Sequence, residues 1–428
     1  MKLPANFKEI PYWLDPPPLI KSFPADSFPA RADVLVIGSG YTGTTAAIRL
    51  RQAGFQVALI DRLKLATAAS ARNGGMTLTG LSRGQPKFEK MLGEEKAKQL
   101  FAESLESIDS VERLVAEGGI ECDFQRCGHL EAAFKPAHFE NLKREQKSLH
   151  NRYHHETLVL APGELQREIG SELYHGGLLH PASAGLHPAK YIAGLITLAD
   201  GLGVELFEEV SAEAIESQGS SFTIRTNRGV MAADAVIIAT NGYTGPLTPW
   251  LRRRLVPTES LMIATEALPA DLAASLIPGG RMIYDTKIFL YYFRLAPDAN
   301  RLLFGGRPKF PRRSLRENAT YMYRDMLRVF PRLEDVGITH AWSGKIGSTL
   351  DRLPHIGRHN GLYYALGYCG HGVALATYLG EKLAAMVQGK DPNTAFADLP
   401  FRAIPFYNGK PWFQPLVYAY FSLLDLIV

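Results

Sequence analysis

The sequence predicts an α/β protein in which a parallel-sheet domain alternates along the chain with a second domain that contains an antiparallel sheet. The parallel sheet is indicated by a strand, turn, helix and second strand over residues 33–61, and by later strands at 204–210 and 235–243. The second domain is indicated by polar helices from about 87 to 160 and by alternating aromatic strands over 261–307. A chain of 428 residues with 46% hydrophobic content can bury two such cores.

The two domains are predicted to interleave in chain order. The expected division is a Pro-rich arm over the surface (1–30), the parallel-sheet domain in three parts (31–86, 166–250 and 341–400), a helical insert (87–165) and a β-sheet (251–340) of the second domain, and an apolar tail (401–428). The N-terminal arm has no apolar core of the signal-peptide kind, so a cytoplasmic protein is expected.

The apolar tail leaves two interpretations open. From Trp412 to Val428 it is too short, and too interrupted by Pro415 and Asp425, to span a bilayer of about 30 Å. A helix docked on the body and an anchor peripheral to the inner face of a membrane both fit its composition.

Charge and cysteine content exclude other classes. The net charge of +4 is small for this length, and the basic run 251–255 is typical of a solvated helix face, so nucleic-acid binding is not predicted. The three cysteines, Cys122, Cys127 and Cys369, supply neither a disulfide framework nor a CxxC pair, so a reducing compartment and no metal site are expected.

A complete βαβ unit opens the parallel-sheet domain. The run 33–37 leads into Gly38-Ser-Gly-Tyr-Thr-Gly43 at the start of a helix, and the strand 57–60 ends at Asp61. In this GxGxxG pattern the first glycine permits the tight turn, the second lets the backbone approach a pyrophosphate, and the third lets the helix pack closely on the strand. Asp61 lies where a carboxylate accepts hydrogen bonds from an adenosine ribose, so the unit predicts dinucleotide binding.

Two later segments suit a bulky planar ligand as well as a pyrophosphate. Residues 66–75 are small apart from Arg72 and Asn73, so this part of the chain can run close to such a ligand. The buried strand at 235–243 ends in a small-residue turn, which allows a second close approach of the backbone.

A third segment, GYCGHGVALATY at 367–378, places Cys369 and His371 between glycines just before an apolar run with helical spacing. It could hold a metal, pair a nucleophile with its base, or use neither side chain. The helical spacing puts the glycines at a helix N-terminus, where backbone N–H groups favour an anion.

These segments, with four others, resemble a known family. The motifs are GSGYTG (38–43), SARNGG (70–75), ATNGY (239–243), YFRL (292–295), LLFGGR (302–307), DRLPHIG (351–357) and GYCGHGVAL (367–375). With them the chain resembles the D-amino-acid oxidase superfamily of FAD enzymes, nearest the γ-glutamylputrescine oxidase-like and glycine oxidase branch, over nearly all residues after the arm. The resemblance implies FAD, held by a Rossmann-like FAD-binding domain with an interleaved antiparallel-sheet substrate domain.

The resemblance also implies which residues contact FAD. The helix N-terminus at 370–373 would face the flavin edge that becomes negative on reduction, so that neither Cys369 nor His371 need be chemical. The backbone of Val210 would contact adenine. The predicted set is Gly38, Ser39, Gly40, Tyr41, Thr42, Gly43, Asp61, Arg62, Ser70, Arg72, Asn73, Gly74, Gly75, Val210, Thr240, Asn241, Gly242, Gly347, Gly370, His371, Gly372 and Val373.

FAD is expected to be held without a covalent bond. Sarcosine oxidases of this superfamily attach FAD to a cysteine, and Gly344 or its neighbours stand at the corresponding place in this chain. No cysteine lies between Cys127 and Cys369.

Four residues are candidates for contact with substrate or flavin at the reacting end: Tyr292, Arg294, Lys345 and His371. Arg294 could instead pair with a nearby aspartate, Asp285 or Asp298. Lys345 falls near the place where glycine oxidases carry a carboxylate-binding arginine, but lysine would act there as a point charge. His371 fits a structural hydrogen-bonding role as well as a catalytic one.

The expected reaction is oxidation of a CH–NH bond of an amine or amino acid (γ-glutamylputrescine-like, a secondary amino acid or similar) to the imine, by hydride transfer to FAD, followed by hydrolysis. A single GxGxxG indicates electrons from the organic substrate rather than from NAD(P)H. Sarcosine oxidases activate O2 with a lysine over the flavin, but 291–295 (YYFRL) contains none, so O2 and quinone both remain open as acceptors. A non-catalytic FAD-binding protein is the alternative from another class.

Overall fold

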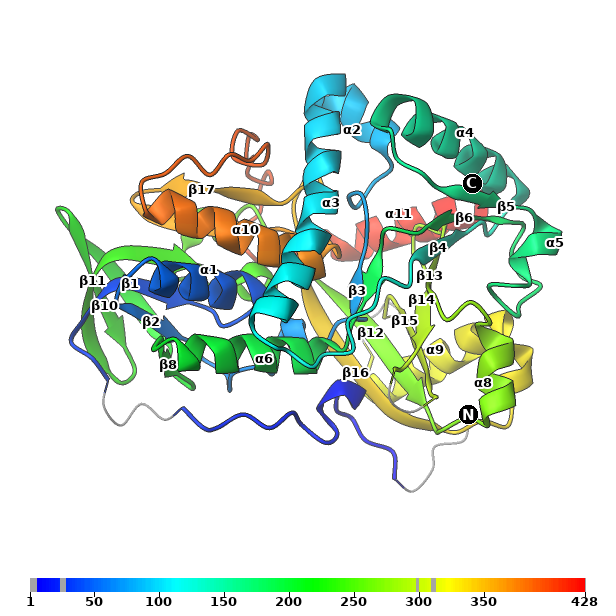
Figure 1. Cartoon of the computed structure of the whole chain (residues 1–428), viewed down its shortest axis with the longest axis horizontal. Helices are drawn as coiled ribbons and strands as arrows, with labels where there is room; N and C mark the ends of the chain where they lie inside the picture. Colours follow the sequence, from blue (N-terminus) through cyan, green and yellow to red (C-terminus); the bar gives the residue numbers. More distant parts are fainter. Residues whose placement is uncertain (1–5, 24–27, 298–299, 309–312, 428) are drawn as a thin grey trace.

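The computed structural model describes residues 6–23, 28–297, 300–308 and 313–427. It contains two eight-stranded sheets that lie next to one another, each with its own helices (Figure 1). The α/β fold class with an interleaved sheet domain is confirmed.

The first sheet has the strand order β17-β18-β11-β1-β2-β8, with β10 and β9 added at β11. From β8 through β2, β1 and β11 to β18 the neighbouring strands are parallel. Its strands are β1 (Arg31–Ile37), β2 (Val57–Ile60), β8 (Glu205–Phe207), β9 (Ala212–Gln218), β10 (Ser221–Thr226), β11 (Gly229–Ile238), β17 (His355–His359) and β18 (Leu362–Leu366). Helices α1 (Tyr41–Gln52), α6 (Pro188–Gly201) and α10 (Gly372–Val387) cover one face of this sheet (Figure 1).

The central strand β1 is buried on both faces. Val34 and Val36 belong to the core that includes α1 and α10, whereas Leu35 and Ile37 belong to the core on the opposite face. Because successive strand side chains point to opposite faces, a strand covered on both sides reads as a continuous apolar run. This confirms the predicted βαβ unit. The helix predicted within the segment that begins at 367 is also present, as α10.

The second sheet has the order β16-β12-β15-β14-β13-β4-β6-β5 and is antiparallel except for the pair β13 and β4. Its strands are β4 (His129–Ala132), β5 (Leu158–Leu160), β6 (Gly177–His180), β12 (Val256–Thr265), β13 (Met282–Asp285), β14 (Tyr292–Leu295), β15 (Leu302–Gly306) and β16 (Ile338–Ser348). The helices of this half are α2 (Gln85–Leu92), α3 (Glu94–Glu117), α4 (Pro136–Tyr153), α8 (Ala270–Leu276) and α9 (Leu315–Val329), together with short α5 (Pro162–Leu165).

Some strands fall on the other side of the predicted domain boundaries. Strand β6 pairs with β4 and β5 in the second sheet, although it follows the expected boundary at 165. Strand β16 runs eight residues past the expected boundary at 340, because it stays paired with β12 up to Ser348. Apolar strands occur in both domains, so composition alone does not show to which sheet such a strand belongs.

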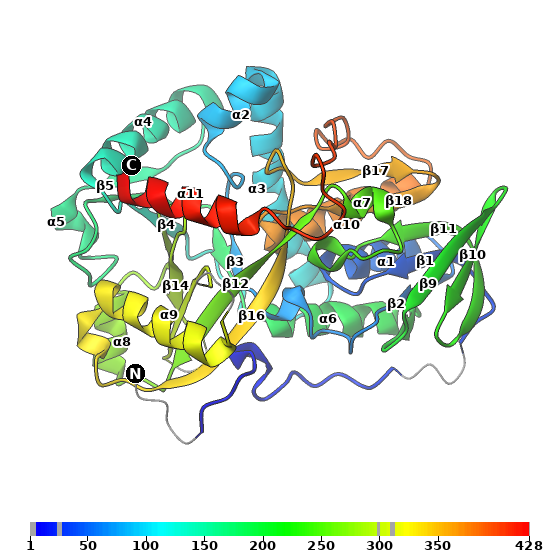
Figure 2. The same ribbon diagram turned by 180° about the vertical axis from the view of Figure 1, so that it is seen from behind.

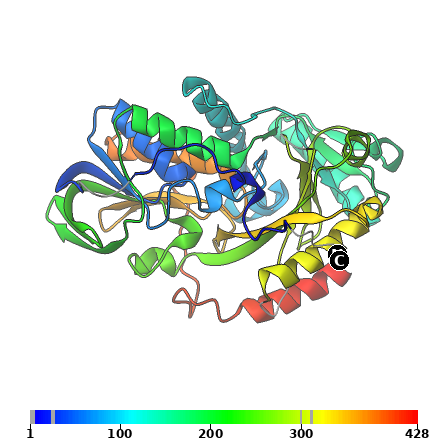
Figure 3. The same ribbon diagram turned by 90° about the horizontal axis from the view of Figure 1, so that it is seen from below.

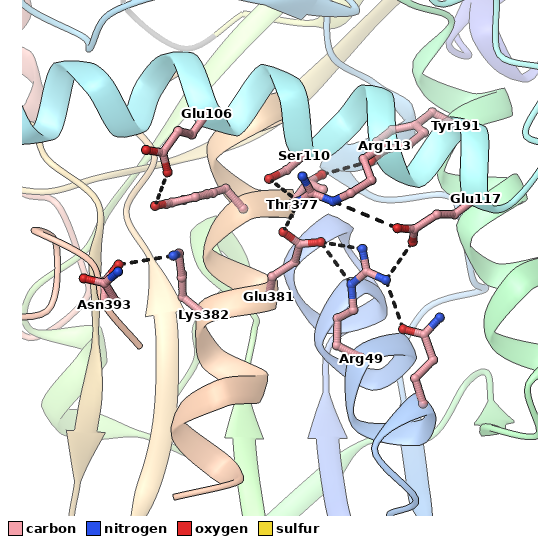
Figure 4. A network of polar contacts seen from close by, with 12 residues as sticks. Arg49, Glu106, Ser110, Arg113, Glu117, Tyr191, Thr377, Glu381, Lys382 and Asn393 are labelled. Atoms are coloured by element: carbon pink, nitrogen blue, oxygen red, sulfur yellow. Dashed lines mark hydrogen bonds and ion pairs between the residues drawn. The ribbon is translucent and has the colours of Figure 1, made fainter. Parts of the chain in front are cut away.

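An ion-pair network fixes α3 onto helices of the first sheet (Figure 4). Arg49 of α1 lies 2.7 Å from Glu117 of α3 and 2.6 Å from Glu381 of α10, and Arg113 of α3 lies 2.8 Å from Glu381. The predicted helical insert is therefore packed partly on the parallel-sheet domain, and α3 connects the two halves of the molecule.

The two ends of the chain pack on the body. The N-terminal arm does not only lie over the surface, because Trp13 is 1% exposed and its indole N–H donates to the Asn73 carbonyl at 2.8 Å. At the other end, helix α11 (Gln414–Ile427) lies along the outside of the second domain, on the same side as α9 (Figures 2 and 3). The Asp425 carboxylate accepts from the N–H groups of Ile288 and Phe289 at 2.7 and 3.0 Å. Among the described residues, no helix is long and apolar enough to cross a membrane.

Candidate active site

A cavity of about 1590 Å³ lies between the two sheets and is lined by both of them. The first sheet contributes the loops that follow β1, β2 and β11, and the N-terminus of α10. The second sheet contributes residues from β4, β13, β14 and the end of β15, and α11 closes one side with Val417, Tyr418 and Phe421. The segments that were predicted to meet one ligand therefore surround one space.

The three glycines of the GxGxxG loop have different local tasks. Gly38 has φ of +110°, and a Cβ there would lie 2.8 Å from the Ala239 carbonyl oxygen. A Cβ on Gly43 would lie 1.9 Å from the Gly38 carbonyl oxygen. Gly40 lines the cavity, and its Cβ would meet only the Ser70 hydroxyl, at 3.1 Å. Two of the glycines thus serve the fold, and Gly40 keeps the wall of the cavity open.

The acid at the end of β2 is held in place at the cavity wall. Asp61 Oδ2 accepts hydrogen bonds from the Ser39 backbone N–H at 2.9 Å and from the Ser39 hydroxyl at 2.8 Å. Its Oδ1 accepts from the Leu63 N–H at 2.9 Å. Asp61 lines the cavity whereas Ser39 does not, so Ser39 orients the acid rather than forming the wall.

The N-terminus of α10 presents Gly370, His371, Gly372 and Val373 to the cavity. Burial, and then the charge of nearby Arg352, lower the pKa of His371 to about 4, so its imidazole is neutral at physiological pH. Cys369 also lines the cavity, but its thiol donates to the Gly367 carbonyl at 3.1 Å and accepts from the Thr349 N–H at 3.4 Å. Among the described residues, no cluster of His, Cys, Asp and Glu could hold a metal ion.

Most of the predicted site residues line this one cavity, but six do not. Those that line it are Gly38, Gly40, Tyr41, Thr42, Asp61, Arg62, Ser70, Arg72, Asn73, Gly74, Val210, Thr240, Asn241, Tyr292, Lys345, Gly370, His371, Gly372 and Val373. Those outside its lining are Ser39, Gly43, Gly75, Gly242, Gly347 and Arg294. Gly242 and Gly347 pack on each other instead, since a Cβ on Gly242 would lie 3.0 Å from the Gly347 nitrogen.

Tyr292 is the best placed of the four catalytic candidates. Its hydroxyl shares a 2.8 Å hydrogen bond with Ser260, and its ring lies where a Cβ on Gly74 or Gly305 would touch it. Burial raises the pKa of Tyr292 to about 12, so the phenol stays protonated and can donate a hydrogen bond.

Arg294 and Lys345 are placed differently from one another. Arg294 is 8% exposed and lies behind the cavity wall, where its Nη1 donates to the carbonyls of Gly75 and Leu186 at 2.8 and 3.2 Å. Of the two alternative ion-pair partners, Asp285 pairs with Lys287 at 3.2 Å, and Asp298 lies outside the described residues. Lys345 is exposed at the rim, 5.5 Å from the centre of the Tyr243 ring.

Several polar residues of the wall were not predicted from the sequence. Arg307 lies just past β15, half-buried at the cavity wall, and its Nη1 donates to the Glu259 carbonyl at 3.1 Å. Burial, and next the charge of Arg352, lower the pKa of Arg307. Glu131 and Glu145 line another part of the wall. The only sequence signal for any of these was Arg307 at the end of the LLFGGR motif.

The cavity fits a dinucleotide with a planar group. Its wall contains a glycine that a Cβ would fill, a fixed acid at the end of β2, and two short small-residue segments that run along it. The family model for DAO, FAD dependent oxidoreductase, matches residues 33–386. The chain belongs to the DAO family of FAD-dependent oxidoreductases. Members of this family use FAD to oxidise amines or amino acids, and this chain is such an enzyme.

Known relatives align with most of the chain. It is 34% identical to a probable oxidoreductase OrdL from Haemophilus influenzae, over 84% of each chain, and 34% identical to γ-glutamylputrescine oxidoreductase from Escherichia coli, over 92% of each. Among solved structures, glycine oxidase from Geobacillus kaustophilus has a TM-score of 0.73 at 22% identity and covers 89% of this chain and 100% of that one. The last likeness concerns the fold alone.

Proposed function

We propose that the enzyme oxidises a CH–NH bond of a small amine or amino acid to an imine, which water then hydrolyses. The observation that supports it best is the single cavity in which the FAD-binding loops face a polar wall that contains Tyr292 and Arg307. FAD, when bound, supplies the acceptor for the hydride that leaves carbon. The E. coli relative is named for γ-glutamylputrescine, an amine of this general class.

In such a reaction the protein orients the substrate and sets the charge around its amine. Tyr292, held by Ser260, can donate a hydrogen bond to a substrate atom, and the neutral His371 adds no charge beside α10. The positive charges of Arg307 and Arg352 disfavour a protonated amine near them, and only the neutral amine can lose hydride readily. We assign these residues to positioning, and assign none of them to nucleophilic attack.

Anaerobic mixing tests this function. Primary and secondary amines and amino acids are added to the FAD-loaded enzyme, and the flavin band near roughly 450 nm is followed for bleaching. Bleaching by a member of the panel supports the proposal. A flavin that stays oxidised with every compound, although binding is seen by calorimetry, would favour the non-catalytic FAD-binding alternative.

FAD is proposed to be bound without a covalent link. Cys369 is the one thiol among the described residues that lines the cavity, and its sulfur is turned to the backbone of Gly367 and Thr349. Its burial and these contacts leave it a small structural side chain.

The outer face of α11 favours a second candidate, a membrane-peripheral dehydrogenase that passes electrons to quinone. On α11, Leu416, Tyr420 and Leu423 are 70%, 59% and 55% exposed, and Trp412 just before the helix is 62% exposed, while Tyr418 on the inner face of the helix lines the cavity. An apolar stripe with aromatic residues suits the interface of a bilayer, and would bring the cavity close to lipid-soluble acceptors.

Two measurements separate the acceptors. The substrate-reduced enzyme is mixed with air-saturated buffer, where reoxidation within seconds with H2O2 indicates an oxidase. Reduced flavin that persists until a quinone analogue is added indicates the dehydrogenase. Sedimentation with anionic phospholipid vesicles, compared between wild type and Leu416→Ser, tests the membrane contact independently; equal recovery in the supernatant would rule it out.

A further inference from the structure

The cavity has a second charged region, remote from the FAD-binding loops. Glu131 lies on β4 and Glu145 on α4, and both line the cavity wall. In Figure 1 these elements lie on the opposite side of the molecule from β1 and α1, where the glycine-rich loop is found. The FAD-binding residues of the family therefore do not account for these two acids.

Few partners compensate these carboxylates. The Tyr284 hydroxyl donates to Glu131 Oε2 at 3.3 Å, from the residue directly opposite on β13. Within the part of the chain that the structure describes, no hydrogen bond or ion pair reaches Glu145, and Lys87, whose charge opposes the rise in the pKa of both acids, forms an ion pair with neither. Burial, and for Glu131 also the neighbouring Glu145, raise the pKa of both groups. Two such acids side by side destabilise their ionised forms unless a cation joins them.

His180, on the same wall, also has a nitrogen without a hydrogen-bond partner among the described residues. His180 is 6% exposed, lines the cavity, and stacks on His129 at 4.3 Å between ring centres. Its Nδ1 shares a 3.3 Å hydrogen bond with Thr79, whereas its Nε2 has no partner among the described residues. Burial lowers the pKa of His180 to about 3, so the ring is neutral and one nitrogen is an acceptor. This region of the wall thus combines two acids with a neutral imidazole.

The two ends of the cavity carry side chains of opposite kind, with two arginines at one end and two acids at the other. Arg307 and Arg352 lie toward the N-terminus of α10, where positive charge favours a neutral amine, and Glu131 and Glu145 lie where an ammonium is favoured. A molecule with two amino groups would therefore enter in one direction, with its neutral end at the reacting position and its charged end at the acids.

We propose that Glu131 and Glu145 form a subsite for a second cationic group of the substrate, an ammonium at the end remote from the CH–NH bond that is oxidised. The subsite rests on the proposed function only in assigning which end reacts. The substrate class is then α,ω-diamines and their derivatives with a cationic far end, and simple monoamines are poorer ligands.

Calorimetry on the FAD-loaded enzyme at neutral pH tests this subsite. α,ω-Diaminoalkanes are compared with n-alkylamines of the same length, in wild type and in Glu131→Gln and Glu145→Gln. The matched control is Glu140→Gln, an exposed acid on the same helix whose ion pair, among the described residues, is with Lys143 at 2.8 Å. Flavin content and unfolding midpoint are measured for each variant, because glutamine keeps the size of the side chain.

The wild type and Glu140→Gln should bind the best diamine at least about tenfold more tightly than its matched monoamine, since a charged hydrogen bond is lost with the second ammonium. Each Gln variant should lose most of this preference and keep its affinity for the monoamine. Equal binding of the two amines by wild type, absence of diamine binding, or a preference that survives in both Gln variants would overturn the subsite. A preference that is present while no amine bleaches the flavin would uphold the subsite and refute the proposed function.

Discussion

Gly40→Val should separate FAD binding from folding. A Cβ on Gly40 would meet the Ser70 hydroxyl at 3.1 Å, the free end of a side chain, and φ at Gly40 is −71°, which any residue adopts. A Cβ on Gly43 would instead lie 1.9 Å from a backbone carbonyl oxygen. Valine at position 40 therefore occupies the cavity beside the glycine-rich loop, whereas valine at position 43 would disrupt the turn itself.

Gly40→Val should change the thermal stability of the protein much less than its affinity for FAD. Displacement of the Ser70 hydroxyl would weaken the 3.1 Å hydrogen bond that it accepts from the Tyr41 N–H, a loss of about 1 kcal/mol. In a chain of this length the thermal midpoint should then fall by no more than about 2 °C. FAD should lose at least two hydrogen bonds to its pyrophosphate, at about 1.5–3 kcal/mol each, which weakens binding by about a hundredfold or more.

Flavin absorbance relative to protein absorbance after purification measures retained FAD, and titration of FAD into apoprotein, followed by quenching of Trp fluorescence, measures affinity. The matched control is Gly201→Val, at the end of α6, where no atom lies within 4 Å of the added Cβ. Full flavin content in Gly40→Val would refute the site assignment. An insoluble variant, or a midpoint far below that of Gly201→Val, would refute the claim that Gly40 serves the ligand more than the fold.

Three further outcomes are expected. Arg294→Met should lower the free energy of unfolding of the apoprotein by about 1–3 kcal/mol, because the buried Leu186 carbonyl loses the donor that Arg294 supplies and the Gly75 carbonyl keeps only the Leu186 N–H; denaturant titration measures this, and a change below about 0.5 kcal/mol would contradict it. His371→Gln should lower kcat by less than about a hundredfold, since the imidazole is already neutral above pH 4 or so; a larger loss with flavin content intact would make His371 an acid or base. Acid or heat should release intact FAD into the supernatant, and yellow colour retained by the precipitated chain would show a covalent bond.

The elements that surround the FAD-binding loops were predictable because their signals are local. β1, α1 and β2 follow from one apolar run, one glycine pattern and one helix cap within thirty residues, and α10 follows from helical spacing that ends near Gly389, where φ is +74°. Each signal concerns residues close in sequence, and the right-handed βαβ connection leaves little freedom in how they assemble.

The sequence did not predict which residues on one face of a strand reach the cavity. Tyr292 and Arg294 are two residues apart on β14 and therefore face the same side of the sheet. Only Tyr292 lines the cavity, because the next position on that face lies roughly 6.6 Å farther along the strand, beneath Gly75 and Leu186. Periodicity gives the face that a side chain points to, and the packing of the other domain decides which residues of that face meet the ligand.

The meeting of Glu131 and Glu145 at the cavity wall could not be predicted either, because it depends on residues that are far apart in sequence. Glu131 and Tyr284 are opposite one another only because β4 and β13 pair in parallel across 153 residues of chain, and Glu145 reaches them from a helix that follows β4. No pattern in the helical insert indicates that Glu131 on β4 faces a cavity. Yet a partly buried, poorly compensated acid pair destabilises the fold by itself, so we attribute its position beside the cavity to a ligand that supplies the missing cation.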